Sequence, residues 1–318
     1  MRKTIWMSLI LLSVSAAGYA QTTAMPAATL PFTIKPLGNN VYAAIDDPKG
    51  GAGSNSGFVI GDDGVAVIDT FVNPAAAKQL LAEIQKLTKL PVRFVVNTHY
   101  HLDHVAGNGV FAETGALIIG HRNIRGWIHS ENLKFFGKEI KPEQRAMVEG
   151  LVAPSVIYDS AIELYLGSRR IVVRYYPGHT GGDSVVSIPD AQVVFCGDLF
   201  WKKTLPNLID GTTEKWAATD AKLAAEAPKA TFVPGHGDVG NAADVQEFAG
   251  YLNDLRTVMA QPVKDGLTGD ALANAVMPKL QEKYGSWNFF DYFLKRNISD
   301  MAKELRGEKQ IPKPPEQQ

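Results

Sequence analysis

The chain has 318 residues, of which 45% are hydrophobic and 20% charged, a composition typical of an ordinary globular protein. Lys and Arg together number 32 and Asp and Glu 33. This balance lacks the basic surplus that binding to a phosphate backbone requires, so we expect no nucleic-acid partner. The single cysteine, Cys196, excludes an intrachain disulfide.

The first twenty residues have the features of an export signal. Arg2 and Lys3 give a positive start, an apolar stretch follows over residues 5–17, and Gly18 and Ala20 are the small residues that signal peptidase needs. The apolar stretch is too short for a comfortable membrane span. We therefore expect residues 1–20 to be a signal peptide cleaved after Ala20. The mature protein would be periplasmic or secreted, without stable membrane association.

The segment before the first histidine cluster predicts strands and one helix. Residues 21–37 contain three prolines and predict a linker. A glycine-rich loop at 49–54 and a Gly-Asp-Asp-Gly turn at 61–64 separate the first strands. Asn73-Pro74 predicts a helix start, and apolar residues at helical spacing continue to Leu87. The strands predicted here are 41–45, 57–60, 65–69 and 92–96.

The second half predicts more strands, at 162–166, 171–175, 184–188, 192–196 and 231–233, with helices over 213–226 and 241–260. Strands and helices in this order indicate an α/β protein built as a layered sandwich, with its main domain over residues 38–262.

The C-terminal part predicts a helical extension over residues 263–306 and a polar, proline-rich, disordered tail over 307–318. The extension contains a dense group of aromatic residues. These side chains either form a wall for substrate or pack the extension onto the main domain, and their density favours packing. The aromatic residues are Trp287, Phe289, Phe290, Tyr292 and Phe293.

The strongest motif follows the buried strand at 92–96 and reads His-Tyr-His-Leu-Asp-His over residues 99–104. The carboxyl ends of strands are where sheet proteins gather their sites. In an extended segment alternate side chains point to one side, and imidazole and carboxylate groups are suitable zinc ligands. The cluster therefore predicts a metal site formed by His99, His101, Asp103 and His104.

Three later motifs each place one further metal-ligand candidate after a short apolar strand. They are Pro-Gly-His-Thr-Gly-Gly around His179, Cys-Gly-Asp ending at Asp198, and Pro-Gly-His-Gly around His236. Each residue alone is a weak signal, but their common position at strand ends supports a shared site. His121 and His129 are expected to be surface or packed residues.

The order of these motifs resembles the metallo-β-lactamase superfamily. The resemblance covers roughly residues 38–260 and implies a four-layer αββα sandwich with a dinuclear zinc site on one edge. It also implies the ligand roles: His99, His101 and His179 on one ion, Asp103, His104 and His236 on the other, and Asp198 bridging both. Within the superfamily, the chain is similar both to the zinc β-lactamases and to the glyoxalase II-like members.

The chemistry of such a site agrees with this resemblance. Zinc lowers the pKa of a bound water to about 7, which gives hydroxide at neutral pH. Asp103 is expected to orient that water and pass a proton, which makes it the predicted catalytic residue. We expect two zinc ions, with iron as the alternative metal, and a small-molecule substrate; the sequence gives no indication of oligomeric state.

The sequence points to two substrate classes. Asp198 resembles the bridging carboxylate of glyoxalase II-like enzymes and favours an ester, lactone or thioester. The zinc β-lactamases with a Cys ligand carry it at that position, whereas Cys196 lies two residues earlier and is predicted to be packed. A following run, residues 203–210, resembles a substrate-binding segment of those lactamases. It makes Lys202, Lys203 and Asn207 candidate substrate contacts, with a surface loop bearing solvated lysines as the alternative.

Two other functions remain open. One is a mononuclear iron persulfide dioxygenase of the same fold, in which two His and one Asp hold the metal. The other is a non-catalytic, metal-dependent binding protein. The complete ligand set and Asp103 favour a hydrolase, and export together with Asn207 favours a β-lactam among its substrates.

Overall fold

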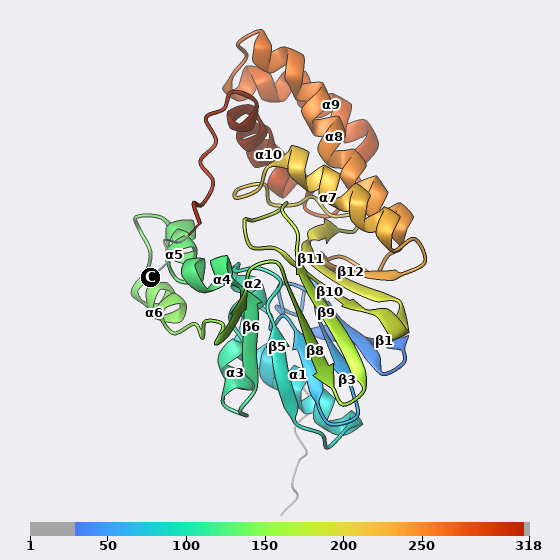
Figure 1. Cartoon of the computed structure of the whole chain (residues 1–318). Coiled ribbons are helices and arrows are strands. Elements are labelled where there is room, and N and C mark those ends of the chain that lie inside the picture. Colours follow the sequence, from blue (N-terminus) through green and yellow to red (C-terminus); the bar gives the residue numbers. More distant parts are fainter. Residues whose placement is uncertain (1–28, 315–318) are drawn as a thin grey trace, which may run out of the picture.

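Two β-sheets packed face to face form the centre of the protein, and helices cover the outer face of each sheet (Figure 1). The structure is a computed structural model and describes residues 29–314. The predicted signal peptide, residues 1–20, lies outside the described residues. The predicted four-layer αββα sandwich with a C-terminal helical extension is confirmed.

The first sheet has seven strands in sequential order. Its first four strands are antiparallel, and the last four run parallel to one another, with helices in the crossovers that parallel neighbours require. The strands are β1 (Phe32–Gly38), β2 (Val41–Asp46), β3 (Ser56–Ile60), β4 (Val65–Ile68), β5 (Val92–Val96), β6 (Leu117–His121) and β7 (Val156–Tyr158). The helices are α1 (Pro74–Leu87), α2 (Leu102–Val105), α3 (Asn108–Ala112), α4 (Arg122–Trp127), α5 (Ser130–Phe136) and α6 (Pro142–Glu149).

The second sheet has five strands in the order β12-β11-β10-β9-β8, and only the pair β11–β12 is parallel. Its strands are β8 (Ala161–Leu166), β9 (Arg169–Tyr175), β10 (Ser184–Ile188), β11 (Val193–Trp201) and β12 (Thr231–His236). A 3-10 turn, η1 (Pro189–Ala191), joins β10 to β11. The helices are α7 (Thr213–Glu226), α8 (Ala242–Lys264), α9 (Gly269–Tyr284) and α10 (Phe290–Leu305).

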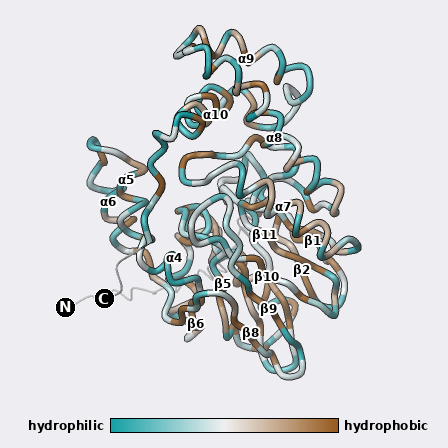
Figure 2. The backbone as a smooth tube through the Cα atoms, turned by 45° about the horizontal axis from the view of Figure 1, so that its top comes forward, coloured by the Kyte–Doolittle hydropathy of each residue, from teal (hydrophilic) through white to brown (hydrophobic). Residues whose placement is uncertain are grey.

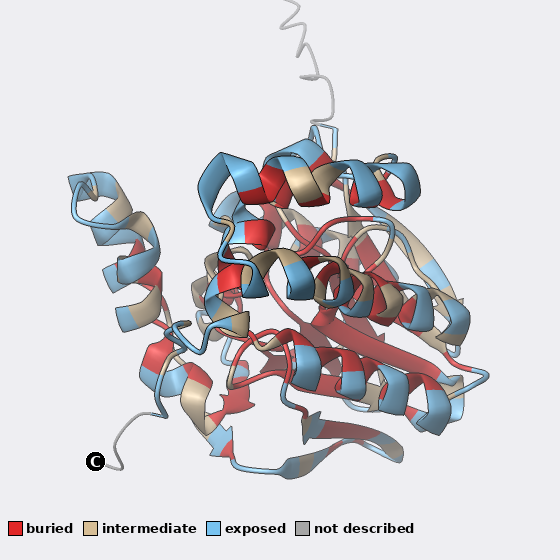
Figure 3. Ribbon diagram, turned by 90° about the horizontal axis from the view of Figure 1, so that it is seen from above, coloured by how far each residue is buried: buried red, intermediate tan, exposed pale blue. Residues whose placement is uncertain are grey.

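Three apolar layers hold the sandwich together. One lies between the two sheets, the second lies between the first sheet and α1 and α3, and the third joins the second sheet to α7, α8 and the extension. The strands are the most apolar parts of the chain (Figure 2). The helices are buried where they face the strands and exposed on their outer side (Figure 3). This burial supplies the hydrophobic stabilisation of the fold.

Local signals set the start of α1 as predicted. The side chain of Asn73 accepts a hydrogen bond from the backbone N–H of Ala76, and Pro74 occupies the first turn. The buried face of the helix includes Leu80 and Ile84, at the four-residue spacing that the pattern indicated. None of the helices between residues 29 and 314 is long and apolar enough to span a bilayer.

Three segment predictions were wrong in part. The predicted linker, 21–37, includes most of β1, because its residues pair with β2 at the edge of the first sheet. The helix predicted over residues 241–260 is α8, which continues through Pro262 to Lys264. A proline in the last turn removes only one helical hydrogen bond. The predicted disordered tail, 307–318, is in contact with the body over its described part: Lys309 Nζ donates to the carbonyls of Leu208 and Gly211, at 2.6 and 2.5 Å, and residues 315–318 lie outside the described residues.

Candidate metal centre

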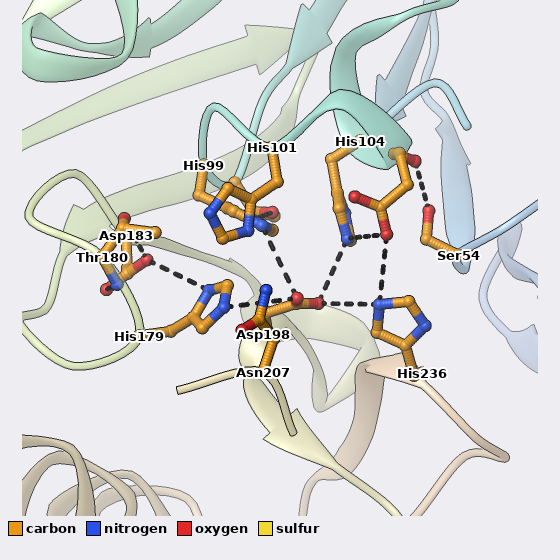
Figure 4. Close-up of polar contacts among 12 residues, drawn as sticks. Ser54, His99, His101, His104, His179, Thr180, Asp183, Asp198, Asn207 and His236 are labelled. Carbon is orange, nitrogen blue, oxygen red and sulfur yellow. Dashed lines mark hydrogen bonds and ion pairs between the residues drawn. The ribbon is translucent and has the colours of Figure 1, made fainter. Parts of the chain in front are cut away.

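The predicted ligands come together at one edge of the sandwich, where strands of both sheets end (Figure 4). His99 and His101 follow β5, Asp103 and His104 belong to α2, and His179 lies in the loop between β9 and β10. Strand β11 carries Asp198, and His236 is the last residue of β12. They form two groups: His99, His101, His179 and Asp198, and Asp103, His104 and His236. Within each group the ligand atoms lie within 4.8 Å of one another.

The spacing of these atoms fits metal coordination. The Nε2 atoms of His99 and His179 lie 3.6 and 3.7 Å from Asp198 Oδ2. The Nε2 atoms of His104 and His236 lie 3.1 and 3.4 Å from Asp198 Oδ1. Ligands about 2.0–2.1 Å from a tetrahedral zinc ion are about 3.4 Å apart. One carboxylate oxygen therefore faces each group, as expected for a bridging ligand.

Buried polar atoms without hydrogen-bond partners provide a second test of the fit. Among the described residues, Nε2 of His99, His104, His179 and His236 and Oδ1 of Asp198 are buried and make no hydrogen bond. Buried polar groups in proteins are normally hydrogen-bonded. Unpaired atoms that converge on two points are ready to bind cations, so the residues present fit two metal ions.

The electrostatics of three of the seven ligand residues also suit metal binding. Although burial raises the pKa of Asp198, the surrounding histidines, His236 and His104 first, hold it well below the usual range. Burial lowers the pKa of His179 to about 3 and that of His99 well below 6.5. Asp198 is therefore an anion, and His99 and His179 are neutral, which are the forms that bind a metal.

Three carboxyl groups lie behind the cluster, and two of them orient its histidines through hydrogen bonds. Asp69 Oδ2 lies 2.8 Å from His104 Nδ1, and Asp69 also accepts hydrogen bonds from the backbone N–H and hydroxyl of Thr98. On the other side, His101 Nε2 lies 2.9 Å from Asp210. Such partners fix the tautomer and direction of metal-binding imidazoles.

The sequence reasoning assigned no role to these supporting carboxylates. The hydroxyl of Tyr100 also donates to Asp210, at 2.5 Å. Asp183, the third of them, lies 4.0 Å from His179 Nδ1 and accepts hydrogen bonds from Thr180. Asp69 follows strand β4 directly, so its place at a strand end next to β5 was an available signal.

The candidate substrate contacts separate in the structure. Asn207 lines a cavity at the metal centre, whereas the two lysines do not. Lys202 Nζ donates to the carbonyl of Val239 at 2.8 Å, and Lys203 Nζ pairs with Glu247. Both lysines are therefore held by groups outside the cavity.

The single cysteine and the two remaining histidines lie outside the metal-ligand cluster. Cys196 is buried in the core, as predicted, and burial raises its pKa well above the ordinary value. His121 Nε2 and His129 Nε2 lie 2.9 and 3.0 Å from backbone carbonyls, and neither residue belongs to a ligand group. The glycine-rich loop at 49–54 is held by hydrogen bonds along its length and contributes only Gly53 to the cavity.

The packing prediction for the aromatic group was wrong for two of its members. Trp287 and Phe290 are buried in the core of the extension, and Phe293 packs against that core while it also lines the cavity at the metal centre. Phe289 and Tyr292 are exposed and line the same cavity. Phe289 is the left-handed N-cap of α10, and position 292 lies on the face of α10 opposite its buried residues.

Comparison with known proteins agrees with the geometry. A family model described as the metallo-β-lactamase superfamily matches residues 50–236. The chain belongs to this superfamily. It is 28% identical over 236 residues to the 2,4-dinitroanisole O-demethylase subunit beta of Nocardioides sp. (strain JS1661), covering 74% of this chain and 68% of that one.

A second relative and a solved structure also match the chain. It is 30% identical over 159 residues to the hydroxyacylglutathione hydrolase of Brucella anthropi, covering 50% of this chain and 52% of the relative. The chain thus spans about half the length of that hydrolase. A solved metallo-β-lactamase from Pontibacter korlensis superposes with a TM-score of 0.58 at 23% identity, over 70% of this chain and 99% of that one, and shows the shared fold.

Proposed function

We propose that this chain is a zinc-dependent hydrolase that holds two ions and cleaves an amide- or ester-type bond in a small molecule. The observation that carries the proposal is the position of Asp198, whose two carboxylate oxygens each face one group of histidines at 3.1–3.7 Å. A donor set of imidazoles and carboxylates suits zinc, and also iron.

The residues of the chain would divide the work. His99, His101 and His179 would hold one ion, Asp103, His104 and His236 the other, and Asp198 both. When bound, zinc supplies a water with a pKa near 7 and stabilises developing negative charge. In the reaction the hydroxyl of water joins the acyl carbon, and the remaining proton goes to the leaving nitrogen, oxygen or sulfur.

Asp103 is the ligand residue best placed to move that proton. It lines the cavity, and its side chain is 29% exposed, whereas that of Asp198 is 3% exposed. Its Oδ2 lies 3.3 Å from His236 Nε2. A carboxylate that is open to the cavity can take a proton from water and deliver it to a leaving group.

A specific observation favours each of two substrate classes. The bridging carboxylate supports a lactone, ester or thioester, and the relative named hydroxyacylglutathione hydrolase supports the same class. Asn207 lines the cavity and supports a β-lactam as the second candidate, since its amide can donate to a lactam carbonyl. The N-terminal sequence supports export of the enzyme, which agrees with the second candidate.

The test combines metal analysis with hydrolysis. Purified protein loaded with zinc is assayed on a chromogenic cephalosporin, a lactone and a thioester, beside Asp103→Ala and the matched control Asp63→Ala. Asp63 is an exposed aspartate far from the centre, paired only with Arg93. We expect about two zinc ions per chain, and turnover that Asp103→Ala abolishes and Asp63→Ala preserves.

Other outcomes contradict the proposal or select between its two substrate classes. A protein that purifies with iron and consumes oxygen with a persulfide is a dioxygenase. A zinc-loaded protein that cleaves none of the three substrates, yet retains a stable partner in pull-downs, is a binding protein. Cleavage of the lactone and thioester but not the cephalosporin selects the first substrate class.

A further inference from the structure

The cavity at the metal centre has predominantly apolar walls. Its volume is about 410 Å³, and it opens directly onto ligand residues of both groups, including His101 and Asp103. Apart from metal ligands, its polar side chains are Asn132 and Asn207. The other side chains that line it are apolar or aromatic, namely Val72, Leu102, Phe135, Trp201, Phe289, Tyr292 and Phe293.

An unbroken series of aromatic rings runs from a metal ligand to the surface. The ring of Trp201 stacks on that of His236, with centroids 3.9 Å apart and an interplanar angle of 23°. Phe293 meets Trp201 edge-on at 6.2 Å, and Tyr292 meets Phe293 at 4.7 Å. Such contacts are favourable geometries for aromatic pairs and hold the rings in place.

The extension is fixed to the main domain at this wall. The backbone N–H of Asn288 donates to the carbonyl of Lys203, and its own carbonyl accepts from Leu205, both at 2.9 Å. The next residue, Phe289, has a left-handed backbone with φ of 60°, a conformation that a bulky side chain rarely adopts. Figure 1 shows α10 above the edge of the sandwich that carries α2. The fold thus holds Phe289 in a strained position beside the site.

Three large aromatic side chains at the mouth of the cavity are exposed to solvent. Phe135 is 57% exposed, Phe289 47% and Tyr292 67%. They come from two separate helices and their caps, α5 and α10, yet line the same cavity. Grouped apolar side chains that remain open to water usually mark a binding surface.

No cationic side chain lines the cavity itself, although the guanidinium of Arg296 lies 5.9 Å from the centre of the Tyr292 ring. None of the residues that line the cavity, all of them within 29–314, is Lys or Arg. Lys202 and Lys203, which follow the lining residue Trp201, are both paired with carboxylates of α8, Asp244 and Glu247. Desolvating an anion in such a cavity without a partner is unfavourable.

We propose that this cavity binds an uncharged apolar group, aromatic or alkyl, next to the bond that is cleaved, and discriminates against substrates with a carboxylate there. The inference rests on the proposed hydrolase function and specifies its substrate class. Since the wall contacts the metal ligand His236 through Trp201, a group held against it lies beside the reacting centre.

Two esters of equal chain length test the discrimination. The zinc-loaded protein is given 4-nitrophenyl butyrate and mono-4-nitrophenyl succinate, which share a leaving group and differ by a terminal methyl or carboxylate. The rate of Asp103→Ala is subtracted to remove reaction outside the site. We expect kcat/KM to favour butyrate by at least about tenfold, and to rise by up to about fourfold per added methylene in longer esters.

Variants of the wall provide the matched comparison. Tyr292→Ala should lower kcat/KM for the longer neutral esters by about three- to tenfold, with little change for the short ester 4-nitrophenyl acetate. The control is Tyr165→Ala, which removes another exposed tyrosine, on β8, that does not line the cavity. Tyr292→Arg should improve the succinate ester by about two- to fivefold, as expected for one exposed charge pair.

Binding of the neutral fluorophore N-phenyl-1-naphthylamine separates this inference from the hydrolase proposal. If no ester, lactone or thioester is cleaved but the probe binds and Tyr292→Ala weakens its binding, the cavity assignment stands and the hydrolase proposal fails. If esters are cleaved with equal rates for butyrate and succinate, or Tyr292→Ala behaves like Tyr165→Ala, the cavity assignment is overturned.

Discussion

A methyl group at Gly235 should damage the metal centre even though no ligand residue is replaced. Gly235 precedes His236 at the end of β12, and a Cβ built on it would lie 1.9 Å from Asp198 Oδ1. Ordinary van der Waals contact begins at 3.4 Å. The carboxylate oxygen would therefore have to move by the difference, 3.4 − 1.9 = 1.5 Å, whereas metal sites tolerate about 0.2 Å.

We expect Gly235→Ala to weaken metal binding by at least about 10–100-fold, the loss seen when a supporting residue of a metal site is removed. Metal content after dialysis and competition with a chromophoric chelator measure the effect. The same Cβ would meet the backbone of Gly197 at 2.9 Å. The metal-free variant should therefore also lose about 1–3 kcal/mol of stability from overpacking.

Gly250→Ala is the matched control for that substitution. Gly250 lies inside α8, and a Cβ there meets nothing within 4 Å. This variant should gain about 0.5–1 kcal/mol in the free energy of unfolding, because alanine favours a helix over glycine, and should bind metal as the parent does. Full metal content in folded Gly235→Ala would refute the position assigned to Asp198.

Three further predictions concern groups around the centre and in the core. Asp210→Asn should weaken metal binding by about 10–100-fold, because His101 loses its charged partner, while Tyr100→Phe, which keeps that carboxylate, should have the smaller effect in the same chelator competition. Burial raises the pKa of Asp220 well above 3.8, so its contribution to stability is full at low pH and is lost as the pH rises above about 4. The urea midpoint of the metal-free protein should therefore fall less between pH 5 and 8 in Asp220→Asn than in the parent. Equal slopes of midpoint against pH in the two proteins would contradict the raised pKa. Leu80→Ala, in the buried face of α1, should cost about 2–5 kcal/mol by urea unfolding and leave metal content unchanged; a smaller cost would mean that this core relaxes around the gap.

The metal ligands could be predicted from the sequence because each belongs to a short motif at the end of an apolar strand. The place of each motif after a strand can be read from neighbouring residues alone, and the fold then brings the strand ends together at one edge. Asp210 illustrates what could not be predicted. It contacts His101 across 109 positions of the sequence, and no pattern within its own loop indicates that partner.

The edges of the fold were harder to predict for a physical reason. The residues of β1 at the border of the first sheet pair on one side only, so its sequence is less apolar than that of a central strand such as β4. The tail is polar, yet Trp127 donates from its indole nitrogen to the carbonyl of Lys313 at 2.8 Å. Backbone contacts of this kind leave no trace in the side-chain pattern.

One irregular strand joins the metal centre to the cavity wall. In a regular strand Cys196 and Asp198 would share a face, but the register of β11 against β12 shifts on both sides of Gly197, which has φ of 50°. This irregularity turns Asp198 toward the cluster while Cys196 stays in the core, as bulges beside active sites commonly do. The same strand ends at Trp201, the innermost ring of the wall. A change in the path of β11 would therefore alter metal binding and substrate discrimination together, whereas a change in α10 would alter substrate discrimination alone.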